Sequence, residues 1–196
     1  MAGNAGAADQ GGTDPQAKGV KALLQIGTVA LAAGAIVLVQ DAILGERQLG
    51  VTEWLLSKPL SRSAYVLSKL LSHSLGILVV LVGLQGVIAY GLLSLASGEP
   101  FPLPPYLVGM AGLALHTLFY TALTLMMGVL TESRGQLLGV SLGALLGGLL
   151  IASLLGRFAM LTPWSIRGRL PSTVMREALP LPIWLPLCTT AALTLL

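Results

Sequence analysis

The chain has 196 residues, of which 55% are hydrophobic and only 10% are charged, and its formal net charge is +3. Because a soluble domain carries about 25% charged residues, this composition excludes a soluble enzyme, a nucleic-acid-binding protein and a disordered chain. A mean hydropathy of +0.85 and 24 glycines are typical of an integral membrane protein, since glycine is more frequent in membrane helices than in soluble ones.

Residues 1–19 consist mainly of Gly, Ala, Asp, Gln and Pro without a periodic apolar pattern, which predicts a flexible tail. Residues 20–196 contain five charge-free windows of 19, 29, 32, 22 and 19 residues. A membrane-spanning helix needs about 20 apolar residues. No window alternates with period two, so we predict an all-α fold, a polytopic transmembrane helix bundle. The expected spans are about 22–40, 70–95, 106–130, 136–156 and 181–196.

The last of these spans is short. Pro180, Pro182 and Pro186 lie near its start, and proline is tolerated only in the first turn of a helix. A helix that starts near Ile183 would be roughly 21 Å long, against a membrane core of about 30 Å. We expect either a re-entrant helix or a chain that stops before its natural end, and we favour the second.

The charged loops leave the orientation open. Loop 41–69 and the turn near 131–135 share one side and hold five basic residues. The tail, loop 95–105 and loop 156–180 share the other side and hold six. Because orientation follows an excess of Lys and Arg on the cytoplasmic side, this balance does not decide it.

Loop 41–69 is predicted to contain two helices. Residues 46–57 suit a short helix that ends at Lys58, because Pro59 disfavours helical geometry in the residue before it. Ser61 is a good N-cap for a second helix, which continues through Lys69 into the next span. Trp54 and several leucines lie beside charged residues, so the loop either docks a partner protein or lies on lipid headgroups.

The stretch 45–69 resembles the signature of the ABC-2 type permease family, the membrane subunits of type-2 ABC exporters. That signature reads Gly-Glu-Arg, then Gly-Thr, Glu, Leu-Leu, Pro, Ser-Arg and a downstream Lys. Val51 stands where the family usually has Thr. The matching residues are Gly45, Glu46, Arg47, Gly50, Glu53, Leu55, Leu56, Pro59, Ser61, Arg62 and Lys69.

The resemblance implies that loop 41–69 is cytoplasmic and couples to a separate ABC ATP-binding subunit. The coupling residues would be Glu46, Arg47, Gly50, Glu53, Trp54, Leu55, Leu56, Pro59 and Arg62. It further implies an exporter that works as a homodimer or heterodimer of permeases in the plasma membrane of a bacterium or archaeon. The family usually has six spans, so the first would be missing here and the last short.

This chain has no phosphate-binding loop of the Gly-x-x-x-x-Gly-Lys-[Ser/Thr] type. We therefore expect it to bind no cofactor itself, and ATP to be hydrolysed in the partner subunit. Its two histidines are not spaced with acids or cysteine as metal ligands, so we expect neither a metal site nor a catalytic residue.

Small and polar residues mark the predicted spans. Gly139, Gly143 and Gly147 repeat every four residues, a pattern that lets helices pack closely within one subunit or between two. Gln85 and His116 lie deep in spans, where they either hydrogen-bond between helices or line a transport pathway.

Two alternatives to transport remain. A membrane assembly or regulatory subunit could use loop 45–69 only to dock a partner. Residues 139–143 also match Gly-x-Ser-x-Gly, the nucleophile elbow of hydrolases, which with His116 suggests an intramembrane serine hydrolase centred on Ser141.

Overall fold

In the computed structural model, the described residues are 15–51, 57, 61–154, 188 and 190. Their regular structure is entirely helical, with no strand in these ranges. The elements in chain order are α1 (Pro15–Val39), α2 (Asp41–Gln48), α4 (Arg62–Gly76), the π-helix η1 (Ile77–Leu84), α5 (Gln85–Ser97), α6 (Leu103–Leu130) and α7 (Arg134–Leu154).

Three helical stretches of this part are long and apolar enough to cross a membrane: Gly19–Gln48, Ser63–Ser97 and Leu103–Leu130. The 21-residue helix α7 carries no charged residue after Arg134. The predicted all-α polytopic membrane bundle is thus confirmed. Of the expected last span, 181–196, only residues 188 and 190 are described.

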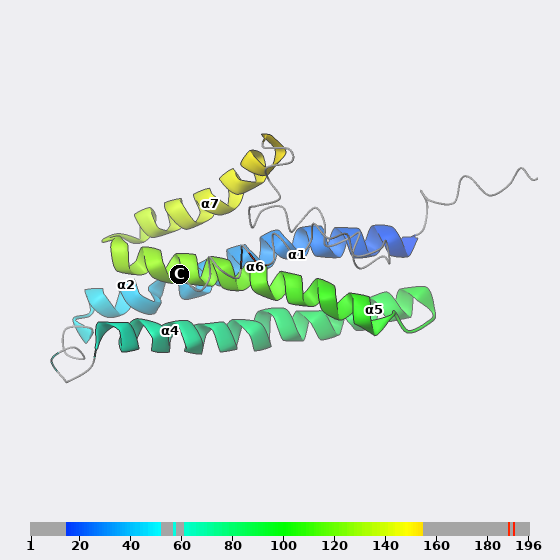
Figure 1. The fold of residues 1–196 in the computed structure, drawn as a ribbon, viewed down its shortest axis with the longest axis horizontal. Coiled ribbons are helices and arrows are strands. Elements are labelled where there is room, and N and C mark those ends of the chain that lie inside the picture. Colours follow the sequence, from blue (N-terminus) through cyan, green and yellow to red (C-terminus); the bar gives the residue numbers. More distant parts are fainter. Residues whose placement is uncertain (1–14, 52–56, 58–60, 155–187, 189, 191–196) are drawn as a thin grey trace, which may run out of the picture.

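Consecutive spans alternate in direction (Figure 1). α4, η1 and α5 form one continuous helix that runs antiparallel to α1, and α6 returns alongside α1. Gly27 of α1 faces Leu113 of α6, while Gly34 faces Leu81 of η1. As a result, α2, the start of α4, the end of α6 and the start of α7 gather at one end of the bundle.

The core lies between α1 and α6. On α1 the side chains of Ala32, Ala35 and Ile36 are completely buried. Tyr120 of α6 and Leu145 of α7 pack into the same region. Because lipid tails are as apolar as these side chains, close packing rather than escape from water holds such helices together.

Threonines line the buried face of α6. Thr117, Thr121 and Thr124 are completely buried, and each hydroxyl donates to the backbone carbonyl four residues earlier at 2.7–3.0 Å. A polar group without a partner is costly in a membrane interior. These local bonds satisfy the hydroxyls and leave a surface of methyl groups for packing.

Two helix boundaries differ from the sequence-based expectation. α1 begins at Pro15, inside the segment 1–19 assigned to a tail, because proline is preset for the first helical position. The helix expected over 46–57 does not begin at Glu46, since α2 runs from Asp41 to Gln48 and a turn follows at Leu49 and Gly50; residues 52–56 of that stretch lie outside the described residues. The N-cap is confirmed, because Ser61 Oγ accepts a hydrogen bond from Ala64 N at 3.2 Å.

We expect Leu31→Ala to destabilise the bundle by about 2 kcal/mol, mainly because the cavity left at a tightly packed helix contact does not collapse. Leu31 is 2% exposed in the core. Leu38→Ala on the same helix is the control, because Leu38 is 63% exposed and leaves no cavity. Thermal unfolding in detergent micelles measures both, and equal loss of stability would contradict the assigned core.

Candidate functional site

α2 leaves the end of α1 and turns its apolar side inward. Ile43 and Leu44 are 3% and 1% exposed. Ile43 packs with Tyr65 of α4 and Leu125 of α6, and α6 approaches closely because Gly128 has no side chain beside Ile43. This packing leaves the charged side chains of α2 at the rim of the bundle, where they reach three other helices.

Glu46 joins α2 to α4. One carboxylate oxygen forms an ion pair with Lys69 Nζ, and the other accepts a hydrogen bond from the Tyr65 hydroxyl at 2.8 Å. Tyr65 and Lys69 are four residues apart, so they lie on the same face of α4. The Lys69 ammonium also lies 5.9 Å from the centre of the Tyr65 ring. Each group in this cluster therefore has two contacts that hold it in place.

Arg47 joins α2 to the end of α6. Its guanidinium donates to the backbone carbonyls of Val129 and Thr131 at 3.3 and 3.5 Å. Carbonyls at a helix C-terminus have no partner within the helix and carry the negative end of its dipole, so a cation is favoured there. Asp41 extends the pattern to α7 through an exposed ion pair with Arg134 at 3.0 Å.

We call this set the α2 junction: Asp41, Glu46 and Arg47 of α2 with their partners on α4, α6 and α7. Three charged residues of one short helix thus connect four helix ends. Such an arrangement is suited to passing a displacement of α2 to the membrane spans.

Gly50 ends α2 in a left-handed conformation, with φ +73°. Its N–H donates to Arg47 O, and the preceding N–H of Leu49 donates to Gly45 O, both at 3.1 Å. This is the usual helix C-terminus built on glycine, because an L side chain clashes in that conformation. The glycine of the signature therefore sets the direction in which the chain leaves α2.

The structure brings together Glu46, Arg47 and Gly50 of the predicted coupling residues. Glu53, Trp54, Leu55, Leu56 and Pro59 lie outside the described residues. Arg62 starts α4, and its side chain is likewise outside that part.

Three side chains of the junction were not predicted from the sequence: Asp41, Tyr65 and Arg134. The backbone carbonyls of Val129 and Thr131 were not predicted as partners either. Tyr65 could have been found, since it stands one helical turn before the matched Lys69. The pairing of Asp41 with Arg134 carries no sequence signal, because the two residues are far apart in the chain.

In the glycine stripe of α7, Gly139 and Gly143 are exposed and Gly147 is half-buried. Side-chain carbons placed at Gly139, Gly143 and Gly147 would meet none of the described neighbours within 4 Å. α7 instead packs through the buried residues Leu137 and Leu145.

The two polar residues of the predicted pathway lie in different settings. Gln85 is exposed on the outer surface at the start of α5, and the structure shows no hydrogen bond from its amide to a described residue. His116 is buried on α6, with its ring edge against Tyr120 at a centroid distance of 5.1 Å.

The Gly-x-Ser-x-Gly match lies within the continuous helix α7, where Ser141 is completely buried. A nucleophile elbow requires a sharp turn between a strand and a helix. No such turn exists at Ser141, so the hydrolase geometry is absent there.

We expect Glu46→Gln and Lys69→Met each to destabilise the fold, and the double variant to lose less than their sum. The reason is that each single change leaves one member of a half-buried pair without its partner. Thermal unfolding of the four proteins should give a coupling energy of about 1 kcal/mol. Strict additivity would contradict the assigned pair.

We expect Gly50→Ala to cost about 1 kcal/mol, because a side chain is strained in the left-handed conformation. Gly91→Ala is the matched control, since Gly91 lies within α5 and has no atom of the described chain within 4 Å of the added carbon. Alanine is the better helix former, so this control should be neutral or stabilising. The same thermal assay compares them, and an equal effect of both changes would refute the role assigned to Gly50.

Comparison with known proteins gives one family match. The model of the ABC-2 family transporter proteins matches residues 3–165, most of the chain. No curated protein and no solved structure is significantly similar to it. The match includes loop 41–69 and every helix of Figure 1. The chain therefore belongs to the ABC-2 family of transporter proteins, as a membrane-embedded permease component of an ABC transporter.

Proposed function

We propose that the chain is the permease subunit of an ATP-driven exporter in the plasma membrane of a bacterium or archaeon. A separate ABC ATP-binding subunit docks on residues 45–69 and supplies the work. The observation that carries this proposal is the α2 junction, in which Glu46 and Arg47 of the family signature connect α2 to α4 and α6.

The mechanism we infer is mechanical. Closure of the ATP-binding subunits pushes on loop 41–69. α2 moves with the loop, because the glycine turn at Gly50 sets the angle at which the loop continues from α2. The Glu46–Lys69 pair passes the push to α4, which continues without a break to Ser97. Arg47 passes it to the end of α6. The bundle then shifts between two packed states by small sliding and hinge motions of its helices.

A second permease, identical to this chain or different from it, would cover the exposed amide of Gln85 and the exposed glycines of α7. Gln85 lies within the charge-free window between Lys69 and Glu99, where an exposed amide in lipid is costly. The glycine stripe of α7 offers a surface on which another helix can approach closely. Both features support a dimer of permeases rather than a single bundle in lipid.

Docking without transport is the alternative that needs an experimental answer. It requires only the loop surface, whereas transport also requires the α2 junction behind it. The two proposals therefore differ in what happens when the junction is altered and the loop is not.

We expect Glu53→Ala combined with Pro59→Gly to abolish capture of a phosphate-loop ATPase from native membranes. Lys69→Met should retain that ATPase but uncouple it, so that its hydrolysis in lipid nanodiscs no longer rises when the permease is present. The physical reason is that Lys69, at the α4 end of residues 45–69, pairs with Glu46 in the α2 junction and is not one of the predicted coupling residues. Affinity capture with mass spectrometry measures binding, and phosphate release measures coupling.

The control is Glu99→Ala, at the opposite end of the bundle, which should change neither quantity. Full stimulation of the ATPase by Lys69→Met would favour docking alone. Failure of the intact chain to capture any such ATPase would overturn the proposed coupling.

A further inference from the structure

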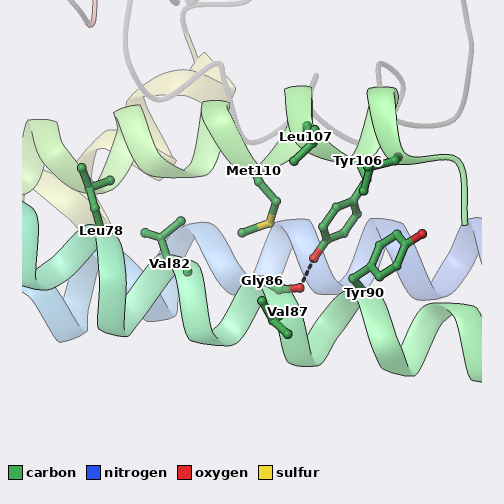
Figure 2. A pocket seen from close by; sticks show the side chains of 10 residues that line it. Leu78, Val82, Gly86, Val87, Tyr90, Tyr106, Leu107 and Met110 are labelled. Carbon is green, nitrogen blue, oxygen red and sulfur yellow. Dashed lines mark hydrogen bonds between the residues drawn. The ribbon is translucent and has the colours of Figure 1, made fainter.

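An apolar groove of about 330 Å³ lies between the second membrane-spanning stretch, Ser63–Ser97, and α6 (Figure 2). Its floor and walls include Leu78, Val82, Gly86, Tyr90, Tyr106 and Met110. Ligand pockets of proteins begin at about 300 Å³, and an engineered apolar cavity of about 150 Å³ already holds benzene. The groove therefore has room for a hydrocarbon segment larger than benzene.

The backbone of the second span opens this groove. The π-helix η1 contributes Leu78, Val82 and Gly83 to its lining, and π-helical turns are frequently found at functional sites. Gly86 leaves the floor without a side chain, and a carbon added there would lie only 2.7 Å from Met110 Cε. A larger residue at position 86 would thus displace Met110 and fill the space.

The polar atoms near the groove are already bonded. The Tyr106 hydroxyl donates to Gly86 O at 2.6 Å, which Figure 2 shows as the dashed line. The Tyr90 hydroxyl donates to Phe101 O at 3.0 Å. The lining therefore presents carbon and sulfur rather than hydrogen-bonding groups, and a hydrocarbon is the complementary occupant.

The mouth of the groove opens on the outer surface of two membrane-spanning stretches. Val87 and Leu107 at its edge are 73% and 55% exposed. In a bilayer that surface faces hydrocarbon, so the molecule next to the mouth is a lipid tail rather than water.

The dimensions of the groove match one leaflet. Along the helix, the lining residues extend from Tyr90 to Leu78, roughly 18 Å. Half of a membrane core is about 15 Å. At the Tyr90 end, Phe101 and Tyr90 both contact Tyr106 edge-on, beside the turn that carries Glu99. Aromatic residues gather at the membrane–water interface, which places this end at the headgroups.

We propose that the groove binds one acyl chain of a bilayer phospholipid, with the headgroup at the turn between α5 and α6. The acyl chain enters sideways from the leaflet that lies on the side opposite loop 41–69. If loop 41–69 is cytoplasmic, as the proposed function requires, this leaflet is the outer one. The binding site itself does not depend on that assignment.

The test is photolabelling of the full chain in nanodiscs of phosphatidylethanolamine and phosphatidylglycerol. They contain a trace of phosphatidylcholine with a diazirine in the middle of one acyl chain. After illumination, mass spectrometry locates the adducts. We expect them to concentrate on Val82, Val87 and Met110, in excess over Leu38 and Leu75, which are exposed on other lipid-facing surfaces.

Val87→Phe should block the mouth and lower groove labelling roughly tenfold, the change that about 1.4 kcal/mol of lost binding produces. Ile88→Phe is the matched control, because Ile88 is 55% exposed but does not line the groove. Both positions face outward, so both variants should fold.

Adducts spread evenly over the outward surface, or equal labelling in the two variants, would overturn the proposal. An absence of adducts in the groove, as expected if another protein segment covers it, would also overturn the proposal. The assay needs no ATPase, so a failure of coupling leaves its result intact, and a failure of labelling leaves the coupling proposal intact.

Discussion

The carboxylate of Glu46 is the group on which the arrangement of the helix ends depends. It accepts from the Tyr65 hydroxyl and pairs with the Lys69 ammonium, so it fixes the start of the second span against α2. A charge beside a membrane is expensive unless it has a partner, and each member of the pair therefore holds the other in place. The charge of Arg47, the next residue, is likewise partnered, because its guanidinium donates to carbonyls at the end of α6.

Away from that end, the bundle is held by a different physical principle. Lipid removes the hydrophobic drive for helices to associate, so contacts must come from close packing. The small residues Ala32 and Ala35 let α1 lie against its neighbours, and the threonines of α6 satisfy their own hydroxyls. Among the described residues, both ion pairs thus lie at one end of a tightly packed bundle. This arrangement suits an element that must move without unfolding.

The two functional surfaces lie on one continuous helix. Residues 62–97 begin at the α2 junction, and their π-helix η1 and α5 line the apolar groove. A π-helix interrupts the regular pattern of hydrogen bonds and changes which side chains face a neighbouring helix. It allows one helix to pack against α1 at Leu81 and still leave a groove against α6 at Leu78 and Val82.

The sequence by itself determined the all-α membrane class, the helix start at Ser61 and the family, because charge-free windows, a capping serine and an in-register signature are local, one-dimensional patterns. It also identified Glu46 and Arg47, but not what they contact. Only the tertiary structure decided that Arg47 meets carbonyls more than 80 residues away, that Asp41 pairs with Arg134, and that a groove opens beside Gly86. These features depend on which helix ends meet and on how closely two backbones approach. Hydrophobic periodicity predicts neither which helix ends meet nor how closely two helices approach, because it describes each helix alone.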